Sequence, residues 1–238
     1  MFSDIKAIIF DLDGTLYNFK WLPFRLMWSL PTDILRIKAD RTVRKSLKGC
    51  DFATPEAYLA EYAQRMAEKT DFKSQDALNW YTNRYMGTMC FLLKRYYSQR
   101  PQLAEVFARL HQQKIKIAIF SDYPRVHQRI RALDFSDETM TTISGIFSAQ
   151  DFGSQKPAPR PFLEIAANLG VTPNQCLVVG DRDDTDGTGA RATGMNFIQI
   201  ETHKTKIIEA HHPVWSWEDF AKWVLEGMEP LENHIQVD

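Results

Sequence analysis

Apolar residues occur along this chain in five short runs, each about as long as a β-strand. The runs cover residues 5–10, 115–120, 145–148, 176–180 and 196–200. Between the later runs, apolar residues recur at helical spacing, which predicts helices over residues 103–113, 125–133, 162–169 and 217–227, the last with Ser216 and Asp219 as a capping pair. This alternation of strands and helices indicates an α/β fold built on a mostly parallel sheet.

A long stretch, residues 17–100, interrupts the alternation. It contains no convincing strand, and its pattern predicts helices such as those over residues 56–69 and 75–94. We therefore expect a helical insertion over residues 17–100 and a core formed by residues 1–16 and 101–238. The insertion has 15 Lys and Arg against 8 Asp and Glu (+7), and the rest of the chain has 14 against 22 (−8), so the net charge of −1 conceals a basic insertion on an acidic core.

The composition is that of an ordinary globular protein. With 238 residues, 44% hydrophobic and 25% charged, the chain is unlike disordered, collagen-like or coiled-coil sequences. Cys50, Cys90 and Cys176 have no metal-ligand spacing, so we expect reduced thiols. Residues 1–6 have no pattern of a secretory signal, and residues 21–37 are interrupted by prolines and charges, so we expect a cytoplasmic protein without a membrane span.

The first candidate for chemistry is a pair of carboxylates at the end of the first apolar run. Asp11 and Asp13 are separated by one residue and followed by Gly14. In an extended chain this spacing puts both acids on one side, and Gly14 permits a tight turn. The acids would then lie at the carboxyl edge of the sheet, where open α/β proteins bind ligands. Asp13 and Gly14 between apolar runs also fit a hairpin turn.

Three further candidates follow later in the chain. Ser121 and Asp122 come directly after the second run, although either could simply cap the next helix. Lys156 stands in a loop bounded by prolines, where an isolated lysine is usually solvated. An acidic loop from Asp181 to Asp186 follows the fourth run and suits a hard cation with oxygen ligands. It is not an EF-hand loop, because Asp186 stands where that loop requires glycine.

Together these residues suit phosphoryl transfer. A cation and hydrogen-bond donors must offset the charge of a phosphate before a carboxylate can approach it. In order and spacing, the four motifs resemble the signature of the haloacid dehalogenase superfamily, which is DxDGT, then Ser or Thr, then Lys, then an acidic GDxxxD-type loop. The resemblance covers nearly the whole chain and implies a Rossmann-like core. The helical insertion resembles the C1 class of cap, a mobile lid.

The resemblance implies a role for each motif residue. Asp11 matches the nucleophile that forms an aspartyl-phosphate, and Asp13 matches the acid/base that protonates the leaving oxygen and later activates water. Ser121 and Lys156 match the residues that hold the phosphate. Asp122 stands beside them, at a position where the family frequently has Asn.

The resemblance also implies a Mg²⁺ site. Its ligands would be the nucleophilic aspartate, the backbone carbonyl of Asp13, and Asp181, with Asp186 in a supporting role. Asp186 follows Asp181 by five residues, where four is commoner in the family. Either Asp183 or Asp184 could therefore be the second carboxylate of this loop.

The predicted function is Mg²⁺-dependent hydrolysis of a small phosphomonoester, a phosphorylated metabolite. Asp13 argues against a dehalogenase, which lacks this second acid, whereas a phosphomutase would keep all four motifs and stays an alternative. No motif indicates nucleic-acid binding, and the oligomeric state stays open.

The alternative to an enzyme is a membrane-surface or binding protein that retains the fold. Its support is the segment of residues 21–48, in which aromatic residues precede several basic ones. Aromatic residues at helical spacing usually form a cap's own core, so we favour an ordinary cap.

Overall fold

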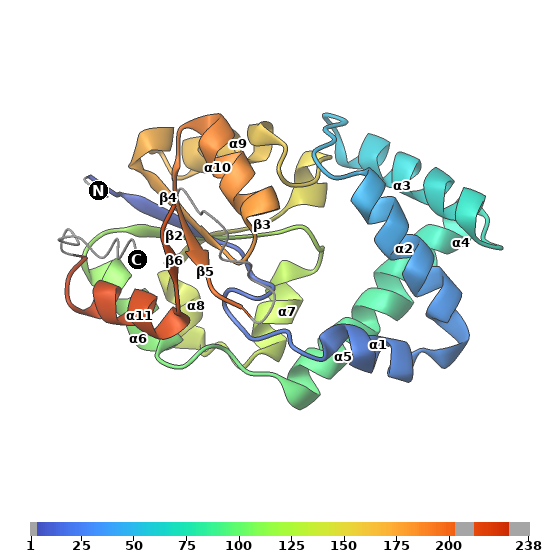
Figure 1. Cartoon of the computed structure of the whole chain (residues 1–238), viewed down its shortest axis with the longest axis horizontal. Coiled ribbons are helices and arrows are strands. Elements are labelled where there is room, and N and C mark those ends of the chain that lie inside the picture. Colours follow the sequence, from blue (N-terminus) through green and yellow to red (C-terminus); the bar gives the residue numbers. More distant parts are fainter. Residues whose placement is uncertain (1–3, 203–211, 229–238) are drawn as a thin grey trace, which may run out of the picture.

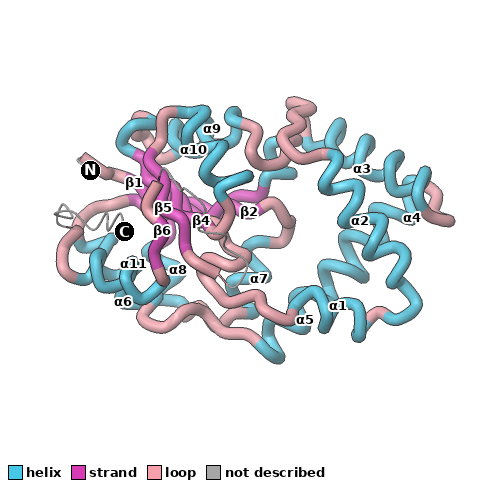
Figure 2. Tube along the Cα trace, in the orientation of Figure 1, coloured by secondary structure: helices cyan, strands magenta, loops and turns pink. Residues whose placement is uncertain are grey.

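The computed structural model describes residues 4–202 and 212–228, and part of the predicted core range lies outside them. Six strands form one parallel sheet in the order β3-β2-β1-β4-β5-β6 (Figures 1 and 2). The strands are β1 (Ala7–Phe10), β2 (Lys116–Ser121), β3 (Ile143–Ser148), β4 (Cys176–Gly180), β5 (Asn196–Ile200) and β6 (Val214–Trp215). The predicted α/β fold with a Rossmann-like parallel sheet is confirmed.

Strand β1 lies in the middle of the sheet, parallel to β2 on one side and to β4 on the other. This placement excludes the hairpin interpretation of the first motif. Ile8 and Phe10 pack into one hydrophobic cluster, and Ala7 and Ile9 pack into a second. In a strand buried on both faces, apolar residues do not alternate with polar ones, so its sequence is a continuous apolar run.

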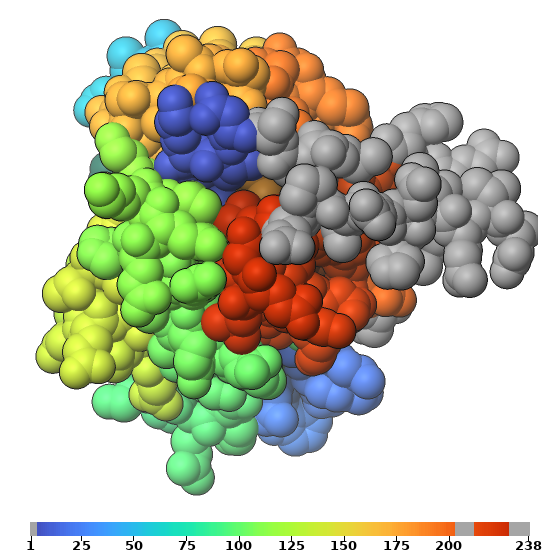
Figure 3. Space-filling model, turned by 90° about the vertical axis from the view of Figure 1, so that its left-hand side faces the viewer, coloured from blue at the N-terminus to red at the C-terminus, as the bar shows by residue number. Residues whose placement is uncertain are grey.

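Helices cover both faces of the sheet. On one face α6 (Leu103–Gln112) and α11 (Trp217–Leu225) lie side by side (Figures 1 and 3), and both contribute aromatic rings against Phe10. On the other face are α9 (Pro159–Asn168) and α10 (Thr188–Thr193). The amide of Asp219 donates to Ser216 Oγ at 3.0 Å, so the predicted cap of α11 is confirmed.

The predicted insertion, residues 17–100, forms helices and no strand. They are α1 (Leu22–Ser29), α2 (Ile34–Ser46), α3 (Pro55–Lys69), α4 (Ser74–Asn79) and α5 (Met86–Tyr96), with a π-helical segment, Trp80–Tyr85, joining the last two. This insertion lies beside the core (Figure 1). Within the described ranges, no helix has both the length and the apolarity to cross a bilayer.

Helix α1 does not follow the expectation that the aromatic residues of this segment form a cap core. Its buried residues are Leu22 and Leu26, whereas Trp21, Phe24 and Trp28 are exposed. The expectation is therefore wrong for these three rings. The two leucines of α1 pack inward, and its rings, Phe24 and Trp28, face outward.

A buried polar network joins the insertion to two loops of the core. Tyr58 donates to the side chain of Gln155 at 3.1 Å, and that side chain donates to the carbonyl of Arg44 at 2.8 Å. Gln150 donates to the hydroxyl of Tyr81 at 2.8 Å. These satisfied buried groups fix the insertion over the loop that carries Lys156.

Candidate active site

The carboxyl ends of β1, β2 and β4 meet at one edge of the sheet and bring the first, second and fourth motifs together. Asp11 follows β1, Ser121 ends β2, and Asp181 follows β4. The amide of Asp11 donates to the carbonyl of Val179 at 2.8 Å, which extends the pairing of β1 and β4 by one residue. The shared edge predicted from the sequence is thus present.

Lys156 is buried at the centre of this edge, with 3% of its side chain exposed. Its Nζ donates to Asp11 Oδ1 at 2.8 Å, to Asp186 Oδ1 at 2.8 Å and to the carbonyl of Phe120 at 2.7 Å. Burial alone would lower the pKa of Lys156, but the carboxylates of Asp11 and Asp186 outweigh it and raise that pKa. The solvated-loop interpretation of this lysine is therefore wrong.

The two carboxylates that bind this ammonium form a cluster with a third, that of Asp181. Oxygens of Asp11, Asp181 and Asp186 all lie within 4.8 Å of one another, and all three side chains are buried. Burial, reinforced by the charges of Asp186 and Asp13, raises the pKa of Asp11 to about 7 against the opposing effect of Lys156. Burial, together with the charges of Asp11, Asp186 and Asp13, also raises the pKa of Asp181. Three carboxylates against one ammonium form a negative, all-oxygen donor set, which fits a hard divalent cation.

The acidic loop presents Asp186, rather than either neighbouring acid, to this cluster. Residues Asp183–Gly187 form a π-helical turn that directs Asp186 back toward the end of β4. Asp183 instead accepts from Arg191 at 2.6 Å, and Asp184 accepts from Arg182 at 2.8 Å. Of the three alternatives left open by the sequence, the geometry therefore favours Asp186.

Two glycines leave space for these carboxylates. Gly14 has φ +93°, and a Cβ on it would lie 2.5 Å from Asp181 Oδ2. A Cβ on Gly180, the last residue of β4, would lie 2.5 Å from Asp186 Oδ2. Gly14 is thus required both for its backbone conformation and for the close approach of Asp181.

The side chain of Asp13 faces away from the carboxylate cluster. It forms an ion pair with Arg129, a fully buried residue of α7 (Val126–Ala132), and accepts hydrogen bonds from Tyr17 and from Ser121 Oγ at 3.2 Å. Burial would raise the pKa of Asp13, but Arg129 and these hydrogen bonds outweigh it and lower that pKa. In this arrangement Asp13 is an ionised carboxylate. Sequence reasoning missed Arg129 and Tyr17, for which no motif gave a signal.

Ser121 and Asp122 do not cap a helix. Helix α7 begins at Val126, and its N-terminus has no side-chain cap. Ser121 Oγ accepts from Arg129 at 3.0 Å and from the amide of Tyr123 at 3.2 Å. Asp122 accepts from the amide of Lys156 at 2.9 Å, so it joins the second motif to the third. The phosphate-binding roles of Ser121, Asp122 and Lys156 stay predictions.

The insertion contributes one buried cation to this region, Arg44 of α2. Its guanidinium donates to Tyr81 Oη at 3.0 Å and to the carbonyl of Asp122 at 3.3 Å, and it stacks 3.9 Å from the ring centre of Tyr123. Among the described residues, no carboxylate lies within 4.0 Å of it to form an ion pair. The sequence showed Arg44 only as part of a basic segment.

The model of the haloacid dehalogenase-like hydrolase family matches residues 5–194, a range that includes all four motifs and the insertion. The chain belongs to this family. Its order of motifs and its arrangement of the sheet edge are those expected for a haloacid dehalogenase-like hydrolase.

Two curated relatives of this hydrolase are similar over most of their length. A glyceraldehyde 3-phosphate phosphatase of Methanopyrus kandleri is 25% identical over 86% of this chain and 88% of its own. A phosphoglycolate phosphatase of Mannheimia succiniciproducens is 26% identical over 93% of this chain and 97% of its own. Among solved structures, a predicted phosphoglycolate phosphatase from Haemophilus somnus superposes with a TM-score of 0.64 at 19% identity, covering 93% of this chain and 99% of its own. The last comparison shows the shared fold.

Proposed function

We propose that this hydrolase cleaves a small phosphomonoester through an aspartyl-phosphate on Asp11, with Mg²⁺ as its cofactor. One observation carries the proposal: the ammonium of Lys156 joins Asp11 and Asp186 at the sheet edge, beside Ser121. A nucleophilic carboxylate, a fixed cation, and a hydroxyl on the adjacent strand are the groups that transfer of a phosphoryl group needs.

The reaction takes two steps. First, a carboxylate oxygen of Asp11 attacks phosphorus, the bond to the leaving oxygen breaks, and that oxygen takes a proton from Asp13. Water then attacks the phosphorus of the aspartyl-phosphate and gives a proton back to Asp13, which releases inorganic phosphate and regenerates Asp11. Lys156 offsets the negative charge where phosphate meets Asp11.

The ion pair between Asp13 and Arg129 affects the first of these steps. A carboxylate held by a guanidinium accepts a proton readily and donates one poorly. Asp13 therefore has to leave Arg129 and take up a proton from solvent before it can protonate the leaving group. The partly exposed side of Asp13 leaves room for this movement, since 22% of its side chain is accessible.

The residues that would hold Mg²⁺ are Asp11, Asp181 and Asp186, together with the carbonyl of Asp13 that the family resemblance implies. When bound, Mg²⁺ supplies Lewis acidity and reduces the repulsion between the phosphate and the attacking carboxylate.

Arg44 supports a substrate that carries a second anionic group. Its guanidinium is buried and touches the loop after β2 that adjoins the phosphate-binding positions. The charge of the buried Asp40 acts on it, but no described carboxylate forms an ion pair with it within 4.0 Å. A buried cation is costly unless an anion pairs with it. A carboxylate on the substrate would provide this partner, so phosphorylated carboxylic acids such as phosphoglycolate are the first compounds to test.

The proposal is tested by screening phosphorylated metabolites for release of inorganic phosphate, with Mg²⁺ and with a chelator. We expect turnover only with Mg²⁺. A phosphorylated isomer as product, without free phosphate, would instead show the phosphomutase. The variant Arg44→Met should lower kcat/KM for phosphorylated acids by at least about tenfold and change p-nitrophenyl phosphate hydrolysis little, as expected for a lost charge-assisted hydrogen bond. The exposed residue Arg41, mutated to Met, is the matched control.

A further inference from the structure

The insertion carries an unusual apolar surface. Seven large hydrophobic residues are exposed in the described part of the chain, and six of them belong to the insertion. These six are Trp21, Phe24, Trp28, Leu35, Phe91 and Tyr96. Isolated exposed apolar residues are ordinary, but a concentration of large rings on one region marks an interaction surface.

Three of the rings form a continuous row along α1. Trp21, Phe24 and Trp28 are spaced by three and four residues, which places them on one side of the helix. Neighbouring ring centres are 6.4 Å and 6.3 Å apart. Phe24 is 60% exposed and Trp28 is 79% exposed. We call this row and the adjoining side chains of α5 the aromatic face.

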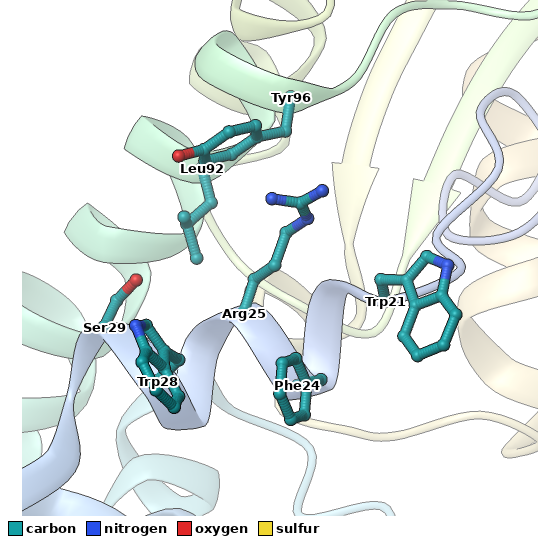
Figure 4. A pocket seen from close by; sticks show the side chains of 7 residues that line it. All are labelled: Trp21, Phe24, Arg25, Trp28, Ser29, Leu92 and Tyr96. Carbon is teal, nitrogen blue, oxygen red and sulfur yellow. The ribbon is translucent and has the colours of Figure 1, made fainter.

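The aromatic face borders a groove between α1 and α5 (Figure 4). The groove has a volume of about 440 Å³ and is lined by Trp21, Phe24, Arg25, Trp28, Ser29, Leu92 and Tyr96. Arg25 extends from α1 toward α5, and its guanidinium lies 4.0 Å from the centre of the Tyr96 ring. The groove is thus apolar with a basic side chain across it.

Every charged residue on these two helices is basic. Helix α1 contains Arg25, helix α5 contains Lys94 and Arg95, and neither helix contains Asp or Glu. Lys20, exposed just before α1, lies 5.9 Å from the ring centre of Trp21. The partner of the aromatic face therefore has to be negatively charged as well as apolar.

We propose that the aromatic face docks on the surface of an anionic lipid bilayer. Trp and other large rings are stabilised at the boundary between headgroups and acyl chains, and Lys and Arg beside them bind anionic headgroups. A second copy of the chain fits less well, because two such faces would bring like charges together. Nothing in this proposal requires a spanning helix, since α1 would lie flat in the interface.

The test is co-sedimentation of the full chain with vesicles of phosphatidylcholine alone or mixed with phosphatidylglycerol. We expect binding to the mixed vesicles that weakens as salt rises, and little binding to phosphatidylcholine. The double variant Phe24→Ser with Trp28→Ser should bind at least about tenfold more weakly, because it removes apolar area that the bilayer would bury. Leu163→Ser, which changes an exposed apolar residue of the core, should bind like the parent chain.

A second set of variants tests the role of the basic residues. Lys20→Glu with Arg95→Glu should reduce binding by at least about tenfold, whereas Lys6→Glu with Lys222→Glu makes the same change of net charge on the core and should leave binding intact. Absence of binding by the parent chain, or equal binding by the variants and their controls, would overturn the proposal. Concentration-dependent dimers that the Phe24 and Trp28 substitutions abolish, without vesicle binding, would assign the face to a second copy instead.

Discussion

The close approach of Gly14 to Asp181 leads to a prediction with a built-in control. An ideal Cβ on Gly14 would lie 2.5 Å from Asp181 Oδ2 and 2.9 Å from a ring carbon of Phe19, at φ +93°. Gly194 also has a positive φ, +73°, but a Cβ on it would meet nothing within 4 Å. Gly14→Ala and Gly194→Ala therefore share the backbone strain, and only the first displaces a candidate metal ligand.

The size of each effect follows from this geometry. A left-handed backbone conformation costs a residue other than glycine about 1–2 kcal/mol, so Gly194→Ala should lose about that much free energy of unfolding. Gly14→Ala should lose more, because its Cβ also meets Asp181 and Phe19. Asp181 is buried and has to move in Gly14→Ala, since real Cβ atoms do not approach within 3.0 Å of another atom. Displacing a metal-binding carboxylate should weaken apparent Mg²⁺ affinity by at least about tenfold.

Urea unfolding without metal and Mg²⁺ titrations of phosphatase activity measure the two effects separately. We expect Gly194→Ala to be less stable but to keep the Mg²⁺ dependence of the parent chain. Gly14→Ala should require more Mg²⁺ and turn over more slowly even where it is fully folded. If both variants showed the same Mg²⁺ dependence, Asp181 would not be held at the metal site by this contact and the reasoning would be wrong.

Three further predictions concern single carboxylates. Asp11→Asn should reduce turnover by at least about 10³-fold in a folded protein, because an amide does not attack phosphorus; circular dichroism and initial rates check this. Asp13→Asn should slow turnover by roughly 10² to 10⁴-fold, less for p-nitrophenyl phosphate than for an alkyl phosphate, and equal losses would exclude Asp13 as proton donor. Burial raises the pKa of Asp40 in the folded chain against the opposing effects of Arg44 and Tyr62, so its ionisation costs stability as pH rises through its unfolded pKa. Asp40→Asn should therefore raise the urea midpoint at pH 7, with no gain near pH 3, below the unfolded pKa of about 3.9; a gain that does not depend on pH would contradict this.

The sheet and the motif residues were predictable because they depend on short stretches of sequence. A strand buried on both faces reads as an apolar run, and a polar residue directly after it has to lie at the carboxyl edge. Strand β6 was not predicted, since its two residues are too few to show a pattern. The sequence also did not identify the second acid of the fourth motif. The π-helical turn that brings Asp186 to the cluster is a backbone conformation, which the residue types of the loop do not reveal.

What the sequence could not indicate is how distant charges pair, and the two buried arginines demonstrate this. Arg44 and Arg129 are each surrounded in sequence by other basic residues, so charge patterning treats all of them alike. In the fold, Arg129 neutralises Asp13 across 116 residues of chain, whereas Arg44 reaches the loop after β2 and forms no ion pair within 4.0 Å among the described residues, although the charge of the buried Asp40 acts on it. A buried guanidinium is stabilised by an anion, so Arg129 holds Asp13 in place, whereas Arg44 is the residue that we propose pairs with a carboxylate of the substrate.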